Sequence, residues 1–372
     1  MIVRPLTEYC TLNMGQSPDS KTYNTQGKGL PFYQGNADFG ETHPITHVWC
    51  SAPVKVAEDG DILISVRAPI GAMNMAVERC CIGRGLAALT PIRNKCSKQF
   101  LYYALQSKVD SLIAQGTGST FKAISKKVLE ATCIPAYSTI EQEQIAETIG
   151  HVDNTIAARR KQLALLDQLV KSRFIELFGE PQRNPHGYKH IKLSDIATYY
   201  NGLTYKPENV AAEGTIVLRS SNIQNSQLDF ADTVRVDCAI KERLMVQNND
   251  ILMCSRNGSA KLVGKVAMIK DIQEPMSFGA FMMIIRSHYF GYLMTYFQMD
   301  DFRQQIKTGA TTTINQITGR MLDDVTIPLP PMALVDQFAA FVEQTDKSKL
   351  AVQKGLQELE ILKKSLMQQY FG

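Results

Sequence analysis

Hydrophobic and polar residues follow two different patterns along the chain. Residues 1–135 and 181–328 hold short apolar runs, such as DILISV, LAALTPI, TIVLRS and FMMIIRS, that are broken by Gly, Pro, Asn and Ser. Such runs predict strands and turns with a few short helices. Residues 139–178 and 332–370 contain no proline, and their apolar residues recur three or four positions apart. This spacing predicts two long amphipathic helices.

Each of the two helical stretches carries the hydrophobic stripe of a helix that packs along another helix. The predicted seam residues are Ile149, Val152, Ile156, Leu163, Leu166 and Leu169 in the first stretch, and Val342, Leu356, Leu359, Leu362 and Leu366 in the second. About 40 residues span roughly 60 Å, too long for one small domain to bury the stripe. We expect an antiparallel coiled coil that relates two halves by an approximate two-fold axis. The alternative is that each helix packs only on its own domain.

The chain also repeats itself. Asp61-Ile62-Leu63 recurs 189 positions later as Asp250-Ile251-Leu252, and Ile134-Pro135 recurs 193 positions later as Ile327-Pro328. Collinear matches with small shifts indicate a duplicated unit with loop insertions. We therefore predict an α+β fold with a β-rich domain over 1–135, a helix over 136–180, a second β-rich domain over 181–330 and a second helix over 331–372.

Composition limits the class of protein. The 372 residues suggest more than one core, and 44% hydrophobic with 20% charged residues is typical of a soluble globular chain. No apolar run approaches the ~18 residues of a membrane span, and the N-terminus lacks the apolar core of a secretory signal. We expect a cytoplasmic protein. Its eight cysteines form no C-x-x-C pair, which favours reduced, structural thiols and no metal site.

No sequence motif for catalysis stands out. There is no G-x-x-x-x-G-K-[ST] loop, no H-E-x-x-H and no G-x-S-x-G, and the GRG at 83–85 lacks the third glycine of a dinucleotide-binding loop. The net charge is +4, and the excess lies in the mixed segments, with 14 Lys/Arg against 10 Asp/Glu in residues 1–135 and 16 against 14 in 181–330. A duplicated chain of this kind indicates a recognition or scaffold protein that contacts a polyanion.

Three stretches of sequence resemble the specificity (S) subunit of type I restriction-modification enzymes. They are GDILISVRAPIG…CIGRGLAAL, QGTGSTFKAISKKVLEATCIPAYSTIEQEQIAETIGHVDNTI, and the second copy TGATTTINQITGRMLDDVTIPLPPMALVDQFAAFVEQTD. The resemblance covers essentially the whole chain in the order domain, helix, domain, helix. It implies two target recognition domains that each read one half of a split DNA site, with the helices setting the spacing between the halves.

The same resemblance implies a non-catalytic chain and catalytic partners. Two modification subunits would bring S-adenosylmethionine and methylate adenine at N6, and restriction subunits would bring ATP and Mg. No cofactor and no membrane are expected for this chain. The second copy has Arg256-Asn257-Gly258-Ser259 where the first has Arg67-Ala68-Pro69-Ile70, so the two domains should read different sequences and give an asymmetric site.

Loop residues with donors and acceptors are the candidates for DNA contacts. In the first domain they are Gln16, Ser17, Lys28, Gln34, Asn36, Arg67, Arg84, Ser119, Thr120 and Lys122; in the second they are Ser220, Ser221, Asn222, Arg256, Asn257, Ser259, Lys261, Thr312, Thr313 and Asn315. The alternatives are ordinary turns for the loops and structural salt bridges for Arg67 and Arg256. At the level of the whole chain, the alternatives are a duplicated protein-binding adaptor and a stand-alone methyltransferase.

Overall fold

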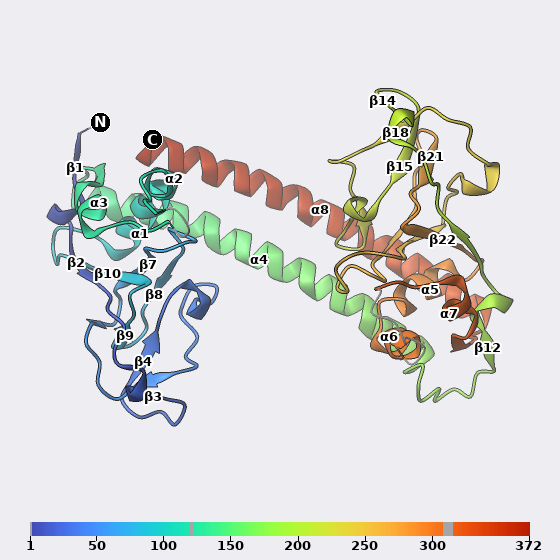
Figure 1. The fold of residues 1–372 in the computed structure, drawn as a ribbon, viewed down its shortest axis with the longest axis horizontal. Coiled ribbons are helices and arrows are strands. Elements are labelled where there is room, and N and C mark those ends of the chain that lie inside the picture. Colours follow the sequence, from blue (N-terminus) through green and yellow to red (C-terminus); the bar gives the residue numbers. More distant parts are fainter. Residues whose placement is uncertain (1, 119–121, 308–314) are drawn as a thin grey trace. The chain divides into compact units, whose positions relative to one another are not determined.

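The computed structural model describes residues 2–118, 122–307 and 315–372, and the chain divides into two compact units. Unit 1 comprises Met1–Lys161 and Gln353–Gly372, and unit 2 comprises Gln162–Val352. Each unit contains one β-rich stretch of sequence and one segment of each of two long helices, as Figure 1 shows.

The β-rich stretch of unit 1 begins and ends with strands that pair with each other. The strands are β1 (Val3–Pro5), β2 (Cys10–Met14), β3 (Tyr23–Asn24), β4 (Leu30–Tyr33), β5 (Trp49–Cys50), β6 (Val56–Ala57), β7 (Ile62–Ser65), β8 (Met73–Met75), β9 (Cys80–Ile82), β10 (Leu86–Pro91) and β11 (Cys133–Pro135). The short helices are α1 (Lys98–Ser107), α2 (Val109–Ala114) and α3 (Lys126–Ala131). The strands form three sheets in the orders β2-β10-β7-β8, β3-β5-β4-β9-β6 and β1-β11.

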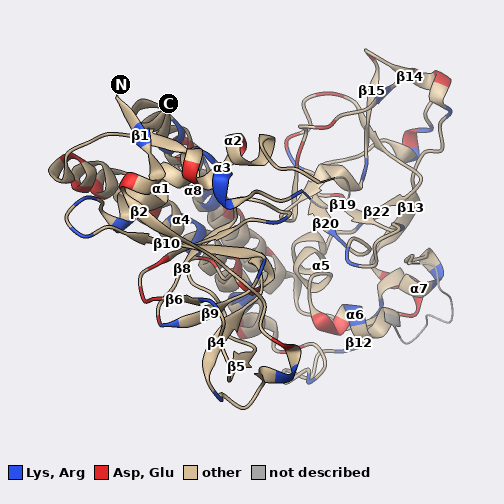
Figure 2. Ribbon diagram, turned by 60° about the vertical axis from the view of Figure 1, so that its left-hand side comes forward, with Lys and Arg blue, Asp and Glu red and all other residues tan. Residues whose placement is uncertain are grey.

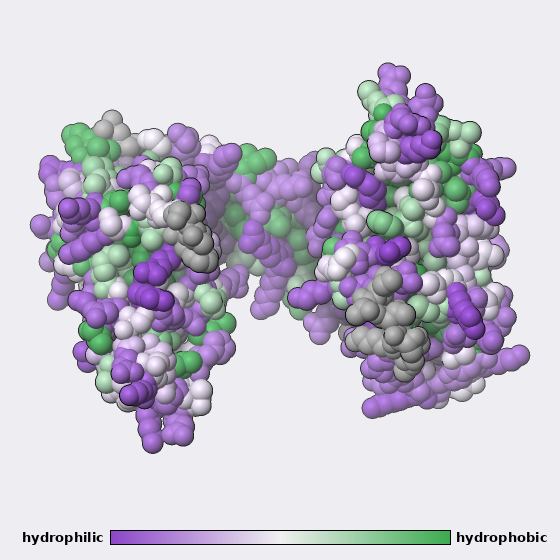
Figure 3. Space-filling model, in the orientation of Figure 1, coloured by the Kyte–Doolittle hydropathy of each residue, from purple (hydrophilic) through white to green (hydrophobic). Residues whose placement is uncertain are grey.

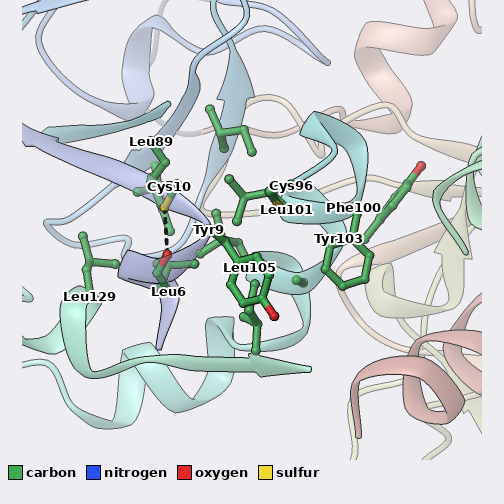
Figure 4. Packing of buried hydrophobic residues seen from close by; sticks show 14 of the residues in the cluster. Leu6, Tyr9, Cys10, Leu89, Cys96, Phe100, Leu101, Tyr103, Leu105 and Leu129 are labelled. Carbon is green, nitrogen blue, oxygen red and sulfur yellow. Dashed lines mark hydrogen bonds between the residues drawn. The ribbon is translucent and has the colours of Figure 1, made fainter. Parts of the chain in front are cut away.

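The four-stranded sheet of unit 1 is buried on both faces. Ile62 and Ile64 of β7 face a core that includes residues of α1, whereas Leu63 faces a second core with Ile82 of β9. Successive side chains of a strand point to opposite faces, so the apolar run DILISV is a strand packed on both sides. Figure 4 shows the first core, where Cys10 Sγ donates a 3.4 Å hydrogen bond to a main-chain carbonyl.

Unit 2 repeats the four-stranded sheet and the terminal strand pair of unit 1. Its strands are β12 (His190–Lys192), β13 (Thr198–Asn201), β14 (Val210–Ala211), β15 (Thr215–Leu218), β16 (Ile223–Gln224), β17 (Gln227–Leu228), β18 (Arg235–Val236), β19 (Ile251–Cys254), β20 (Val266–Met268), β21 (Met276–Phe278), β22 (Met282–Arg286) and β23 (Thr326–Pro328). Its short helices are α5 (Phe290–Tyr296), α6 (Asp300–Lys307) and α7 (Gly319–Asp323). The sheet β13-β22-β19-β20 corresponds to β2-β10-β7-β8, and β12-β23 corresponds to β1-β11. Its outer strands, however, form a four-stranded sheet, β14-β18-β15-β21, and a separate pair, β16-β17. The predicted duplication and the α+β class are confirmed.

The two long helices are α4 (Thr139–Phe178) and α8 (Met332–Phe371), each of 40 residues. α4 begins with a capping box, in which Ser138 N donates to Glu141 Oε2 at 2.8 Å and Glu141 N donates to Ser138 Oγ at 3.4 Å. It is followed by Gly179 at a φ of +75°, a backbone conformation that ends helices and that glycine adopts without strain. Local residues therefore define both ends of α4.

In unit 1, segments of α4 and α8 run antiparallel. Lys363 Nζ lies 2.7 Å from Asp153 Oδ1, and Arg160 Nη2 lies 2.8 Å from Glu360 Oε1. From Asp153 to Arg160 the residue number rises along α4, while the number of the contacting residue on α8 falls from 363 to 360. Contacts in this order show that the two helix segments run antiparallel. The end of α8 also packs into the first core, where the ring of Phe371 lies 5.4 Å from another phenylalanine ring.

The helix segments of unit 2 are antiparallel as well. Lys349 Nζ lies 2.7 Å from Asp167 Oδ1, and the ring centroids of Phe174 and Phe338 are 5.6 Å apart. Phe174 also stacks on Tyr292 of α5 at 5.0 Å, so this end of the helix pair is part of the core of unit 2. The expected antiparallel pairing is confirmed, and each helix also packs on its β-rich neighbour.

The predicted seam residues differ in their burial. Ile149, Val152 and Ile156 are buried. Leu163, Leu166, Val342, Leu356, Leu359 and Leu366 are half-buried. Leu169 and Leu362, however, are 47% and 46% exposed, so their assignment to the seam is wrong for this chain. Phe174 and Phe338 meet at another position of the helix pair, and the predicted hydrophobic stripe is wider than the line of contact.

Candidate nucleic-acid interface

Polar loop residues gather at one edge of the four-stranded sheet of unit 1. β10 is antiparallel to both β2 and β7, so the end of β2, the start of β10 and the end of β7 meet there. Gln16 and Ser17 follow β2, Arg84 precedes β10 and Arg67 follows β7. Gln34, which follows β4, joins them. These five residues are called edge 1.

Hydrogen bonds hold the loops of edge 1 together. Gln34 Nε2 donates to Ser17 Oγ at 2.9 Å, and the Arg84 main-chain N–H donates to the same oxygen at 3.2 Å. Gly85 N donates to Gln34 O at 3.2 Å, and Val66 N donates to Gly85 O at 2.9 Å. Four segments that are distant in sequence are thereby fixed against one another.

The glycines of the GRG turn make this close approach possible. A Cβ on Gly85 would lie 2.5 Å from Gln34 O, and a Cβ on Gly83 would lie 2.5 Å from Gln34 Oε1. No real side chain tolerates such distances to main-chain atoms, so the turn needs glycine at 85. The two glycines allow the turn to pack against the end of β4 and leave Arg84 exposed between them.

The other candidates of unit 1 lie at different distances from edge 1. Lys122 is beside it, because Ala68 N donates to Lys122 O at 3.0 Å and Arg67 forms a β-bridge with the next residue. Asn36 lies in the turn just after Gln34. Lys28 precedes β4, whose four residues span ~13 Å, so it sits at the opposite end of that strand. The structure therefore does not bring Lys28 to edge 1.

Unit 2 has an equivalent edge. Ser255 N donates to Phe281 O at 2.9 Å, which repeats the bond from Val66 N to Gly85 O in unit 1. Arg256 follows Ser255 as Arg67 follows Val66, at the end of the corresponding strand. Four residues at this position, namely Ser220, Arg256, Asn257 and Phe281, are called edge 2.

Hydrogen bonds fix the loops of edge 2 as they do in edge 1. Asn257 Nδ2 donates to Ser220 Oγ at 3.3 Å, and Asn257 Oδ1 accepts from Ser259 N at 3.0 Å. Asn315 Nδ2 donates to Gly258 O at 3.3 Å, so Asn315 lies against the same turn. The polar candidates of unit 2 are therefore close together, although several of their groups already have partners within the protein.

Asn222 is a wrong prediction as a DNA contact, since its side chain is completely buried. Its Nδ2 donates to the carbonyls of Asp229 and Asp232 at 2.8 and 2.9 Å, and its Oδ1 accepts from Arg219 N at 2.8 Å. The turn after β15 needs these bonds, because buried main-chain groups must have partners. The neighbouring Ser221 is half-buried.

The exposed arginines are free of carboxylate partners. Arg67, Arg84 and Arg256 are all exposed, and none of them forms a salt bridge with any residue in the described ranges. Lys261 is exposed close to Arg256 in sequence. Guanidinium groups at a sheet edge, without an internal counter-charge, are available to an anionic ligand such as a phosphate or to a base edge.

Four candidates lie outside the described residues, and two residues at the edges were not predicted from the sequence. Ser119, Thr120, Thr312 and Thr313 lie outside the described residues. Phe281 was missed because FMMIIRS reads as a buried strand, yet its side chain is 58% exposed. Arg219 occupies the place of Gln34; its Nη2 lies 2.7 Å from Asp232 Oδ2, while its Nε is buried without a partner in the described part of the chain.

The cysteines next to edge 1 are not nucleophiles. Burial raises the pKa of Cys80 to about 12 and the pKa of Cys81 to about 11. Thiols with such values stay protonated at neutral pH, and the thiolate is the reactive form. Both residues are fully buried in β9, where they contribute to the cores beneath the edge.

Charged residues are dispersed over both units. Figure 2 shows Lys and Arg interspersed with Asp and Glu along the ribbon. Within the described ranges, no three His, Cys, Asp or Glu side chains form a group that could hold a metal ion. No helix in the described part of the chain combines the length and the apolar character of a membrane span.

Known proteins with similar sequences are specificity subunits. The putative type I restriction enzyme MjaX specificity subunit of Methanocaldococcus jannaschii is 41% identical over 164 residues, which cover 44% of this chain and 39% of that subunit. The MjaIX specificity subunit of the same organism is 22% identical over 393 residues, covering 95% of this chain and 88% of its own length. The chain thus spans less than half of the first relative and most of the second.

A solved structure shares the fold over the whole chain. The crystal structure of a type I restriction-modification system S subunit from M. genitalium superposes with a TM-score of 0.60 at 16% identity, covering 100% of this chain and 96% of that one. A family model described as "Type I restriction modification DNA specificity domain" matches residues 1–168 and 185–361. These two matches span nearly the whole chain, and the chain therefore belongs to the family of type I restriction-modification DNA specificity proteins.

Proposed function

We propose that this chain is the non-catalytic subunit that gives a type I restriction-modification complex its DNA sequence specificity. The observation that carries the proposal is the pair of equivalent edges, edge 1 and edge 2. Each gathers exposed arginine and amide side chains from separate loops at the same end of a rigid sheet. Such groups read base edges and position phosphates.

Under this proposal, edge 1 and edge 2 read the two halves of a split site. The halves differ, because the edges have different residues: Arg84 lies between glycines in edge 1, whereas Ala280 stands at that position in edge 2. Helices α4 and α8 would set the separation of the halves, since a helix of 40 residues is roughly 60 Å long.

We further propose that the helices carry two modification subunits. Leu169 and Leu362 occupy equivalent positions of the repeat, 193 residues apart, and are exposed to the same degree, 47% and 46%. Figure 3 also shows hydrophobic residues exposed among hydrophilic ones on the helical segments. Two leucines of equal exposure at equivalent positions of the repeat would give two copies of one partner the same contact.

The catalytic groups would belong to the partners. S-adenosylmethionine would bind the modification subunits that methylate adenine at N6, and ATP with Mg would bind restriction subunits that join the complex. This chain would carry no cofactor, and the complex would act on DNA in the cytoplasm.

The decisive experiment expresses the chain with its modification subunit and maps methylated adenines across a genome. We expect one split motif with two short, unlike halves. Arg256→Ala should relax or abolish recognition of one half, and Arg67→Ala should affect the other half. Methylation without sequence preference in the wild-type complex would refute the proposed function. An Arg256→Ala variant with unchanged affinity and preference would refute its assignment alone.

A test of the two docking positions uses Leu169→Asp, Leu362→Asp and the double variant. Each single change should reduce the number of bound modification subunits from two to one, measured by native mass spectrometry. The double variant should bind none. If all three variants retain two subunits, these leucines are not the docking positions.

A further inference from the structure

The ring of Phe281 is an exposed aromatic surface in an otherwise polar edge. Its side chain is 58% exposed, whereas its neighbours Met282 and Phe278 are buried. The guanidinium carbon of Arg256 lies 5.4 Å from the centre of this ring. A cation at this distance over a ring is attracted by the negative charge of its face.

Main-chain bonds fix the two side chains relative to each other. The carbonyl of Phe281 accepts from Ser255 N at 2.9 Å and from Arg256 N at 3.1 Å. The adjoining strands, β19 before Arg256 and β22 after Phe281, are paired in register, with Cys254 opposite Met282. The ring and the guanidinium therefore rise from adjacent, anchored positions. The contact favours this rotamer of the arginine before any ligand binds.

Within the described residues, edge 1 has no such pair. Gly85 occupies the position of Phe281, because its carbonyl accepts the equivalent bond from Val66 N. A Cβ on Gly85 would lie 2.5 Å from Gln34 O, so unit 1 has no room for a side chain there. Arg67 of edge 1 consequently lacks an aromatic partner at this position. Among the residues that the structure describes, the aromatic–arginine contact at a sheet edge occurs in edge 2.

The chemistry of a stacked, exposed arginine points to a particular base. Arginine recognises guanine through two parallel hydrogen bonds to O6 and N7, and this geometry requires the guanidinium plane to be aligned with the base. A ring in contact with the guanidinium favours one orientation of that plane. A lysine or an unstacked arginine retains the positive charge but not the alignment.

We propose that Phe281 is a specificity-determining residue of edge 2, which positions Arg256 to read a guanine in the half-site of unit 2. The inference rests on the proposed function, since it requires that edge 2 contacts DNA. Phe281 acts through Arg256 and is a positioning residue. Its loss should reduce discrimination at one base while phosphate contacts, and hence most of the affinity, remain.

The test measures methylation by the complex with its modification subunits, on the mapped site and on sites with each base replaced in turn. Phe281→Leu removes the ring but keeps an apolar side chain, and Phe281→Trp keeps an aromatic face. A cation–π contact at an exposed site corresponds to roughly a two- to fivefold change in an equilibrium. We expect Phe281→Leu to lower discrimination at a single guanine by about that factor, in kcat/KM.

The controls are internal to the complex. Discrimination in the half-site of unit 1 and the melting temperature should be unchanged in Phe281→Leu, because the ring is exposed. Arg256→Lys should lower discrimination at the same guanine, and Phe281→Trp should retain that discrimination. The inference is overturned if Phe281→Leu keeps full discrimination, if the base at which discrimination falls is not guanine, or if Phe281→Trp and Phe281→Leu have the same effect. Methylation by the wild-type complex that ignores sequence would overturn the proposed function itself.

Discussion

Replacement of Arg286 by methionine should destabilise unit 2 far more than the loss of a surface ion pair would. Arg286 Nε and Nη2 each donate a 2.8 Å hydrogen bond to the carboxylate of Asp250, which is 1% exposed. This pair joins the end of β22 to the start of β19, at the end of the sheet opposite edge 2. The guanidinium also lies 5.3 Å above the ring of Tyr200.

The magnitude follows from the burial of the carboxylate. Removing one partner of a buried ion pair leaves an uncompensated charge and costs about 3–5 kcal/mol. The side chain of Arg286 is 26% exposed, so water reaches part of the site and favours the lower limit, about 3 kcal/mol. In urea unfolding followed by far-UV circular dichroism, this loss corresponds to a midpoint lowered by about 1–2 M.

Two further variants separate burial from the mere presence of an ion pair. Arg235 forms a bidentate pair with Glu274 at 2.6 and 3.0 Å, but on the surface, so Arg235→Met should cost much less. In unit 1, a threonine, Thr90, stands at the position of Arg286 next to the strand that follows the corresponding aspartate, Asp61. Arg286→Thr should therefore be milder than Arg286→Met. Equal effects of Arg286→Met and Arg235→Met would refute the reasoning.

Three other changes test the edge, the sheet and the helices. Gly85→Ala would place a Cβ 2.5 Å from a main-chain oxygen, so it should lower the free energy of unfolding by about 1–3 kcal/mol and impair recognition of one half-site. A Cβ on Gly35 would meet nothing within 4 Å, so Gly35→Ala should change neither property. Thermal unfolding measures the stability of both variants, and methylation mapping measures their recognition. Burial raises the pKa of Asp61 above its usual value, so the folded state binds this proton more tightly than the unfolded state. Its contribution to stability is full below the unfolded pKa near 4 and is lost as pH rises through the folded pKa. Asp61→Asn should thus gain stability relative to the wild type as pH increases from 4 to 7, and a constant difference across that range would contradict this. Leu166→Asp should destabilise the half-buried helix contact by about 1–3 kcal/mol and weaken docking of modification subunits, while Leu165→Asp, at a residue 54% exposed, should leave stability unchanged in thermal unfolding.

Much of the architecture was predictable because it follows from local periodicity. The absence of proline and the spacing of apolar residues define helices that the structure places at Thr139–Phe178 and Met332–Phe371. The offset between the two copies predicted a duplicated fold, and the strand order of the two sheets confirms it. Periodicity did not identify every residue of the helix contact, because the hydrophobic stripe is broader than the line along which the helices meet. Leu169 and Leu362 belong to the stripe but are exposed.

The candidate contacts depended on information that no linear pattern contains. Arg67, Arg84 and Arg256 were correctly expected at strand ends, because turn residues follow apolar runs. Asn222 looked identical to an exposed loop residue, yet in the interior its Nδ2 donates two hydrogen bonds to the turn and its Oδ1 accepts one. Phe281 looked like a core residue, yet it stands outside the sheet.

The duplication, the two helices, the class of fold and the resemblance to specificity subunits could all be predicted from the sequence. These properties depend on residue types and their spacing along the chain. The three-dimensional fold was needed to show that loops distant in sequence meet at edge 1 and edge 2, and which side chains are exposed there. Antiparallel pairing brings the ends of different strands together, and the room beside a main-chain carbonyl decides whether a position holds glycine or an aromatic ring.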